Sequence, residues 1–412
     1  MYSAISYLCK KTLKIMEKLM QRFLALLEGT DTNFLRDQHF LVNWNDRMTA
    51  IVGARGVGKT TLLLQHIKLH LSTRDTIYVT ADDFYFTEHK LLDFAEEFHK
   101  MGGRHFFIDE IHKYPGWSKE LKLIYDYLPN LQVIFTGSSI LDIFKGSDDL
   151  SRRVLLYKMH GMSFREYINM KHHLSLPAYT LDQILSHQVK TPGVEFPLAT
   201  FKEYVRSGYY PFSGQASYME RLLQTVNTTL ETDIPMFAKL NANTAIKLKR
   251  LMLVLAQSVP FKPNYSKLAE IMDIDRQTLG DYITYMEKAG LIKQLYDSTG
   301  GVRGLGKVAK LYLENTNLAY AFSQDIPDIG NLRETFFFNQ VSQSHNIMAS
   351  ARADFEIEGK TFEVGGRKKG NSQIEGLGEA YIVKDDIEYG FGHTIPLWHF
   401  GFIHSSASSV IT

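Results

Sequence analysis

The chain has 412 residues, of which 44% are hydrophobic, so it can bury the cores of two or three domains and is too apolar to be a disordered tail. Its 46 basic and 45 acidic residues leave a net charge of +1, which excludes a global electrostatic pull toward nucleic acid or membrane; such binding would need a local patch. The single cysteine, Cys9, excludes an intramolecular disulfide and a zinc site built from cysteines, and this usage is typical of a reducing cytoplasm.

The first segment, residues 1–30, is predicted to form a helix that packs on its own domain. Apolar residues recur at helical spacing over residues 4–28 and fall near one face: Ile5, Leu8, Ile15, Leu19, Phe23 and Leu26. The lysines follow the apolar start, which is the reverse of a secretory signal, and no run reaches the roughly 20 apolar residues of a membrane span. A basic helix lying on a membrane surface is the alternative, but we expect no membrane partner.

Residues 31–160 show strands alternating with helices, the pattern of a parallel sheet with crossover helices on both faces. The predicted strands are short apolar runs: Met48–Val52, Thr76–Thr80, His105–Ile108, Val133–Thr136 and Val154–Tyr157. This pattern predicts an α/β fold for the first domain. Residues 161–242 read as a helical region broken by prolines.

A phosphate-binding motif follows the first predicted strand. Residues Gly53–Thr60 fit G-x-x-x-x-G-K-[ST] and lead into a predicted helix, Thr61–His70, which is the context that supports the motif. Backbone N–H groups of the loop and the helix N-terminus favour phosphate oxygens, Lys59 reaches the β- and γ-phosphates, and Thr60 ligates Mg²⁺. The residues expected to contact the nucleotide are Gly53, Ala54, Arg55, Gly56, Val57, Gly58, Lys59, Thr60 and Thr61.

A pair of carboxylates ends the third predicted strand. Asp109 is expected to hold Mg²⁺, directly or through water, and Glu110 to polarise the attacking water as general base. A second carboxylate at this point favours hydrolysis over a kinase or simple binding. Capping of the next helix is the rival role for Glu110.

Further polar residues near the predicted site are candidates for contact with the γ-phosphate. Thr136 or Ser138, at the end of the fourth strand, would hydrogen-bond the phosphate or the water. Arg152 and Arg153 precede the fifth strand, and either would supply an arginine to the γ-phosphate, in the same chain or toward a neighbouring subunit. A surface ion pair is the alternative role for these arginines.

Residues 243–313 have the layout of a winged helix-turn-helix: three helices followed by a hairpin, Leu291–Tyr296 and Val308–Leu313. Residues 275–289 contain two basic and three acidic residues, which disfavours insertion of the third helix in a DNA groove. The predicted wing is more basic, with Arg303, Lys307 and Lys310. DNA binding is therefore expected to be weak and carried by the wing, and a protein-binding or structural role is the alternative.

Four motifs together resemble those of a family of prokaryotic AAA-type ATPases. They occur in the family's order: Gly53–Thr60, Ile108–Lys113, Ile134–Ser139 and Met162–Tyr167. The resemblance spans nearly the whole chain and implies an ATPase core, a winged helix and a C-terminal α/β domain similar to restriction endonucleases. It also implies that the nucleotide is ATP, because the residues themselves do not distinguish ATP from GTP.

For residues 314–412 the resemblance implies a nuclease-like cluster that lacks one element. Glu334, Asp354 and Glu363 match the three acids of active members, whereas the position of the activating lysine falls on Gly365. The nearby cations Arg367, Lys368 and Lys369 are off the pattern, although Arg367 or Lys368 could reach back because Gly365 and Gly366 make the loop supple. We interpret the domain as degenerate, gripping nucleic acid or a partner without cutting.

The sequence thus predicts a cytoplasmic AAA-type ATPase that binds and hydrolyses ATP with Mg²⁺ to drive a conformational change. The alternative is a DNA- or protein-binding module switched by nucleotide with little turnover, and an ATP-gated nuclease is a third hypothesis. The partner and the oligomeric state, including a homo-oligomer, stay open.

Overall fold

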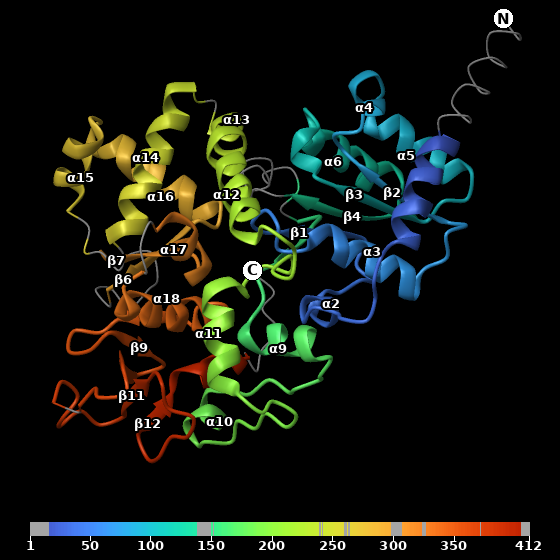
Figure 1. Ribbon diagram of the computed structural model, residues 1–412. Coiled ribbons are helices and arrows are strands. Elements are labelled where there is room, and N and C mark those ends of the chain that lie inside the picture. Colours follow the sequence, from blue (N-terminus) through green and yellow to red (C-terminus); the bar gives the residue numbers. More distant parts are fainter. Residues whose placement is uncertain are drawn as a thin grey trace, which may run out of the picture. The chain divides into compact units, whose positions relative to one another are not determined.

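The computed structural model describes residues 16–137, 150, 152–238, 240, 242–258, 262, 264–297, 307–323, 327–370 and 372–404. Two compact units make up the chain (Figure 1). The first contains the residues up to Gly53 and Gly58–Met159, and the second contains Ala54–Val57 and the residues from His160 on. None of the helices in the described part of the chain combines the length and the apolarity needed to cross a bilayer.

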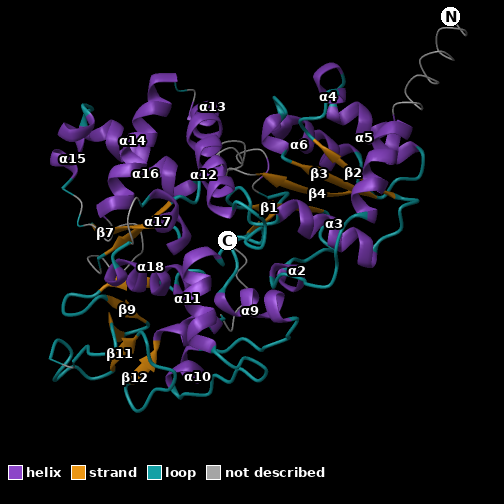
Figure 2. Ribbon diagram, in the orientation of Figure 1, coloured by secondary structure: helices purple, strands orange, loops and turns teal. Residues whose placement is uncertain are grey.

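A five-stranded parallel sheet forms the centre of the first unit, with the strand order β2-β3-β4-β1-β5. The strands are β1 Met48–Val52, β2 Thr76–Thr80, β3 His105–Asp109, β4 Gln132–Gly137 and β5 Leu155–Lys158. Each lies within one residue of its predicted bounds. Figure 2 shows helices on both sides of these strands, so the predicted P-loop α/β fold is confirmed.

Two longer helices of the first unit, α5 and α6, each bury apolar residues at helical spacing. In α5, for example, Leu91, Phe94 and Phe98 are buried at helical spacing, and Phe94 packs on Phe106 of β3 with ring centroids 5.5 Å apart. The described elements are α2 Gln38–Leu41, α3 Lys59–His70, α4 Tyr85–Glu88, α5 Leu91–Lys100, η1 Ile111–Lys113 and α6 Trp117–Tyr127.

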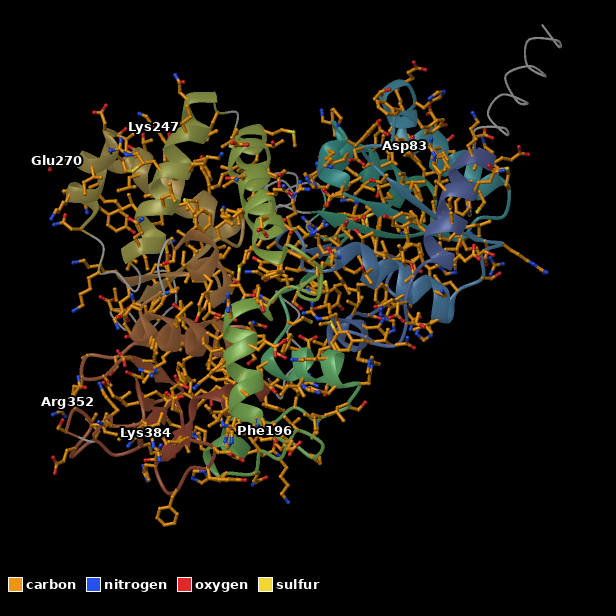
Figure 3. All side chains as sticks on the ribbon, in the orientation of Figure 1. Asp83, Phe196, Lys247, Glu270, Arg352 and Lys384 are labelled. Carbon is orange, nitrogen blue, oxygen red and sulfur yellow. The ribbon has the colours of Figure 1, made fainter. Side chains whose placement is uncertain are left out.

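The N-terminal segment is helical over the described residues 16–28 and packs on this unit. Phe23 is buried and stacks on Tyr78 of β2, with ring centroids 6.3 Å apart. Arg22 pairs with Asp83, the residue labelled in Figure 3. Leu26 is 49% exposed, so its predicted place on the buried face is wrong. The rest of the predicted helix, residues 4–15, lies outside the described residues.

The second unit begins with a helical region. Its first helix starts at a capping box, in which Ser163 accepts from the backbone of Glu166 and the Glu166 side chain accepts from the backbone of Ser163. The elements are α9 Phe164–His172, α10 Leu181–Leu185, α11 Pro197–Ser207, α12 Tyr218–Thr228, the π-helix η2 Thr229–Asp233, α13 Ile234–Ala238, α14 Ala242–Ser258, α15 Tyr265–Met272 and α16 Arg276–Lys288.

A hairpin and a second sheet complete this unit. The hairpin pairs β6 Ile292–Tyr296 with β7 Val308–Leu313, close to its predicted bounds. The sheet has the order β12-β11-β10-β9-β8, with β9 and β10 antiparallel around Gly359 as predicted and β10, β11 and β12 parallel. The remaining elements are α17 Thr316–Phe322, α18 Ile329–Val341, β8 Ile347–Ala349, β9 Phe355–Ile357, β10 Lys360–Gly365, β11 Ala380–Lys384, β12 Thr394–Pro396 and η3 Leu397–Phe402.

Candidate nucleotide site

The loop between β1 and α3 has the backbone conformation that its glycines permit. Gly56 and Gly58 have φ values of +84° and +101°, in the left-handed region that residues with a Cβ rarely adopt. Helix α3 begins directly after them at Lys59, two residues earlier than predicted. The glycines therefore form the turn that brings a helix N-terminus to the end of a buried strand, the arrangement that binds phosphate.

The ammonium group of Lys59 is held inside this loop. Its Nζ donates to the carbonyl oxygen of Gly53 at 2.9 Å, and the residue is only 5% exposed. A buried, hydrogen-bonded cation beside a helix N-terminus makes this point of the molecule strongly favourable for anions.

Asp109, at the end of β3, receives hydrogen bonds from three other elements. Thr60 Oγ1 donates to its Oδ2 at 2.5 Å, and Tyr78 Oη donates to the same oxygen at 2.8 Å. Thr136, from the end of β4, donates to the other oxygen, Oδ1. Burial, and then Asp109 itself, raise the pKa of Tyr78, so the phenol stays a proton donor.

This donor set fits Mg²⁺. A carboxylate and a hydroxyl are in direct contact, and hard oxygen ligands of this kind are what Mg²⁺ binds, usually one or two from the protein together with substrate phosphates. Thr60 and Asp109, predicted from motifs far apart in the sequence, are brought together by the fold. The Tyr78 contact was missed, because nothing in the local pattern of β2 marks a tyrosine as the partner of a residue on β3.

Glu110 has an unusual backbone conformation. Its φ is +53°, in the left-handed region, where a residue with a side chain is strained by about 1–3 kcal/mol. Its amide donates to Thr136 Oγ1 at 3.0 Å, which helps to hold this conformation. Glu110 is the N-cap residue of η1, yet within the described residues its side chain makes no capping hydrogen bond there. The capping role that rivalled catalysis therefore loses its support.

The Glu110 carboxylate lies among cations. One of its oxygens is 3.7 Å from His112 Nε2 and 3.7 Å from Lys113 Nζ, and Lys113 also pairs with Asp82 at 2.6 Å. Sequence reasoning did not assign His112 or Lys113 a role. The sequence could have indicated these contacts, because His112 and Lys113 directly follow the two acids. A 3-10 turn over Ile111–Lys113 brings their side chains near Glu110.

Other predicted contacts are placed differently. Arg55 belongs to the second unit, where its guanidinium pairs with buried Asp233, with an Nη2–Oδ1 distance of 2.9 Å. Arg153 donates to Asp126 at 3.0 Å, the surface ion pair that was the alternative to a catalytic role, and Arg152 is exposed. Thr61 is exposed on α3. Ser138 lies outside the described residues.

In the second unit, the three acids that the resemblance implied do gather. Lys310 Nζ, from β7, lies 2.8 Å from Glu334 Oε2 and 3.2 Å from Asp354 Oδ1, and Tyr312 donates to the same Glu334 oxygen at 2.8 Å. An ammonium group thus bridges the two carboxylates that a metal would bridge in a nuclease. Lys310 is therefore engaged within the unit, and the prediction that it contacts DNA from the wing is wrong.

The position of the absent lysine is also filled. Lys369 pairs with Glu363, and a Cβ built on Gly365 would lie 2.6 Å from the Cγ of Lys369. The aliphatic part of the Lys369 side chain therefore occupies the space next to Gly365, which lies four residues earlier in the chain. Arg367 and Lys368 were the cations considered for this role, but Lys369 is the one that pairs with Glu363. Burial raises the pKa of Glu363, which is 2% exposed.

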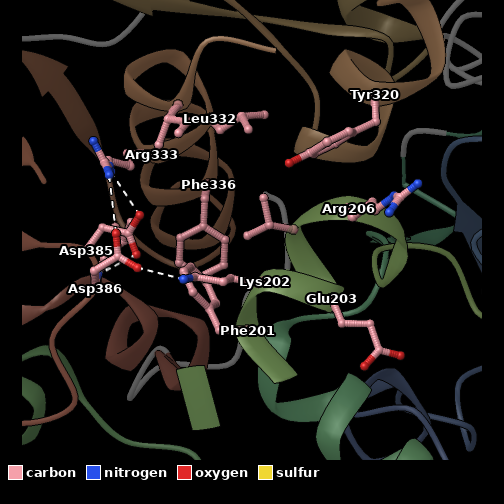
Figure 4. A pocket seen from close by; sticks show the side chains of 13 residues that line it. Phe201, Lys202, Glu203, Arg206, Tyr320, Leu332, Arg333, Phe336, Asp385 and Asp386 are labelled. Carbon is pink, nitrogen blue, oxygen red and sulfur yellow. Dashed lines mark hydrogen bonds and ion pairs between the residues drawn. The ribbon is translucent and has the colours of Figure 1, made fainter. Parts of the chain in front are cut away.

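Two of the hollows in the described part of the second unit have basic residues in their lining. Figure 4 shows one of about 1050 Å³, whose apolar wall includes Phe201, Leu332 and Phe336. Two ion pairs lie in its lining, Arg333 with Asp385 and Lys202 with Asp386, both at 2.9 Å, and Glu203, also in the lining, pairs with Lys171. The other, of about 670 Å³, lies among α15, α16 and the start of β7, and its basic lining residues are Lys262, Arg276 and Lys307.

Comparison with known proteins assigns the first unit more closely. Residues 45–168 match the model of an AAA domain, and residues 198–328 match that of a domain of unknown function. An uncharacterized protein of Methanocaldococcus jannaschii is 26% identical over 301 residues, which are 68% of this chain and 63% of that protein, so the chain covers less than two thirds of its length.

Among solved structures, a Walker-type ATPase of Pyrococcus abyssi aligns with a TM-score of 0.39 and 16% identity over 70% of this chain and 95% of that chain. DnaA from Aquifex aeolicus, bound to AMPPCP, aligns with a TM-score of 0.26 and 18% identity over 61% of this chain and 85% of that chain.

Proposed function

We propose that this chain is an ATPase that binds ATP with Mg²⁺ and hydrolyses it to drive a conformational change. The P-loop, the parallel sheet and the match of residues 45–168 to the model of an AAA domain support this proposal. The observation that carries this proposal is the contact between Thr60 and Asp109, with Lys59 and Glu110 beside them in sequence. These residues bring a phosphate-binding cation, two oxygen ligands and a carboxylate base to the same edge of the sheet.

The role of each residue in this proposal follows from its position in the site. The backbone of Gly53–Thr60 and the Lys59 ammonium bind the phosphates, since both present N–H groups at the N-terminus of α3. Mg²⁺, held by Thr60 and Asp109, would neutralise charge on the β- and γ-phosphates. Tyr78 and Thr136 orient Asp109 by donating to its two oxygens.

Glu110 acts as the base that takes the proton of the attacking water. Asp109 is fixed by three donors, and Glu110 is the next residue along the chain after it. The strained backbone of Glu110 supports the assignment, since conformations of this kind gather at functional sites. The Lys113 ammonium, 3.7 Å away, pairs with this carboxylate.

The test is steady-state phosphate release from ATP and from GTP, with and without Mg²⁺. The proposal predicts Mg²⁺-dependent release from ATP that is faster than from GTP. Equal and negligible release from both, with tight binding retained, would leave a nucleotide switch instead.

A second function is favoured by the groove lined by Lys262, Arg276 and Lys307. Lys262 precedes α15, Arg276 begins α16 and Lys307 directly precedes β7. The three side chains make no ion pair with other described residues, so they can contact phosphates of a nucleic acid. A module that binds DNA and changes state with nucleotide would use this groove. ATP hydrolysis that is unaffected by duplex DNA, together with DNA binding that is unaffected by nucleotide, would argue against such coupling.

A further inference from the structure

Three histidines of the first unit converge away from the nucleotide site. His39 comes from α2, and His66 and His70 are one turn apart on α3, so they share a face of that helix. The Nε2 atoms of His39 and His70 are 3.2 Å apart, and one nitrogen from each of the three rings lies within 4.8 Å of the others.

The rings are fixed by packing. Trp44 stacks on His66 with ring centroids 3.8 Å apart and an interplanar angle of 7°, and its indole Nε1 donates to the carbonyl oxygen of His39 at 2.8 Å. His39 and His66 are only 5% and 7% exposed, whereas His70 is exposed. The cluster is therefore an ordered group with one open side.

Two ring nitrogens of the cluster have no hydrogen-bond partner among the described residues. The Nδ1 atoms of His39 and His66 are buried and make no hydrogen bond with any described residue. Buried polar atoms are rarely left so, and each one calls for an explanation.

We propose that His39, His66 and His70 bind a transition-metal ion of the Zn²⁺ class, with a water in the fourth position. Imidazole is the ligand that Zn²⁺, Ni²⁺ and Cu²⁺ share, and three of them with one open position make a common four-coordinate site. Two nitrogens about 2.0–2.1 Å from one tetrahedral zinc are about 3.3 Å apart, which agrees with the 3.2 Å between His39 and His70. The exposed His70 gives the ion a path from solvent.

The competing explanation is an imidazole–imidazole hydrogen bond between His39 and His70, with one Nε2 protonated. That bond accounts for the short distance, but it gives no reason for a third ring to be fixed within reach of both. The two explanations differ in a measurable way, because only the first predicts a stoichiometric metal complex that depends on all three side chains.

The experiment uses the full chain without nucleotide, since ATP would chelate the probe. Zn²⁺ binding is measured by calorimetry, and Co²⁺ binding by its d–d absorption and by quenching of Trp44, which stacks directly on His66. We expect one ion per chain and quenching of the Trp44 fluorescence that saturates at the same stoichiometry.

His70→Ala is the informative variant, because His70 is exposed and its loss does not open the core. It should weaken binding by more than about tenfold, since even residues outside the ligand set typically change metal affinity by roughly 10–100-fold. His66→Gln should do the same, and His172→Ala, an exposed histidine on α9, should change nothing. Absence of binding, or binding and quenching that His70→Ala and His66→Gln leave unchanged, would overturn the proposal.

Discussion

Thr60 and Asp109 are 49 residues apart in the sequence, yet the hydroxyl of one donates to the carboxylate of the other at 2.5 Å. The contact exists because β1 and β3 are separated in the sheet only by β4, so the loop after β1 and the end of β3 meet at the same edge. This contact joins the phosphate-binding motif to the acid that would hold the metal, and the proposed ATPase function depends on it.

Asp109→Asn should remove the Mg²⁺ dependence of nucleotide binding, because the amide carries no charge for the ion. Tyr78→Phe removes only a donor to the same carboxylate and should weaken Mg²⁺ binding by roughly tenfold, the low end of the effect of residues that orient a ligand. Titration of Mg²⁺ in the presence of a fluorescent ATP analogue measures both. Tyr127→Phe, at an exposed tyrosine, is the control. Equal Mg²⁺ affinity in Tyr78→Phe and in the wild type would show that Tyr78 does not position Asp109.

Lys59→Ala should abolish tight binding of ATP–Mg²⁺. A hydrogen bond to a charged group contributes about 1.5–3 kcal/mol, which corresponds to about a 10- to 150-fold change in dissociation constant. The control is Lys119→Ala, at an exposed lysine of α6. Calorimetry decides the question: if Lys59→Ala binds as tightly as Lys119→Ala, the phosphate-binding role of the loop is wrong.

Lys310→Met should open a cation site in the second unit. The ammonium that bridges Glu334 and Asp354 is removed while the apolar stem is kept, so the two carboxylates repel each other and gain affinity for a divalent ion. Binding of Mn²⁺, followed by electron paramagnetic resonance, should be stronger than in the wild type and in the exposed control Lys267→Met.

The wild-type protein should not cleave single- or double-stranded DNA with Mg²⁺ or Mn²⁺ and ATP, because Lys310 lies between two of the three acids. Gel electrophoresis of the DNA measures cleavage, and Asp354→Ala is the variant that tests whether the acidic cluster causes it. Cleavage by the wild type that disappears in Asp354→Ala would mean that the cluster is active and that Lys310 does not block it.

Duplex DNA binding should be weak and should decline with salt. Arg276→Ala and Lys307→Ala should each weaken it and reduce the slope of log affinity against log salt by about 1, the effect of one phosphate contact. Lys310→Met should leave it unchanged, because this side chain is bound to Glu334 and Asp354. Fluorescence anisotropy at several salt concentrations measures the slopes. Sequence-specific binding that salt does not affect would contradict this description. Arg303, also predicted to contribute, lies outside the described residues.

The sheet of the first unit could be predicted closely, because its strands are short β-rich runs separated by helices and each signal is local. The loop, its lysine and the two acids were also predictable, since each lies at the end of a strand. The residues that hydrogen-bond to them could not be predicted. Tyr78 and Asp109 are 31 residues apart, and only the register of β2 against β3 places them together.

The second unit shows the same limit more strongly. The acids Glu334, Asp354 and Glu363 were placed by resemblance, but the lysines that neutralise them were not. Lys310 comes from the hairpin, 24 and 44 residues before the two acids that it contacts. Lys369 fills the space over Gly365 only because the loop after β10 folds back. The histidine cluster escaped notice because His39 is far in sequence from the two histidines of α3.

The most direct test of the central claim is a comparison of ATP binding and ATP turnover in Glu110→Gln. The amide is nearly isosteric but cannot accept the proton of the attacking water. We predict that calorimetry gives wild-type affinity for ATP–Mg²⁺, whereas phosphate release in a single-turnover assay falls by roughly 10²–10⁴-fold, the usual contribution of a general base. Hydrolysis at the wild-type rate in this variant would contradict the account and make Glu110 a structural residue.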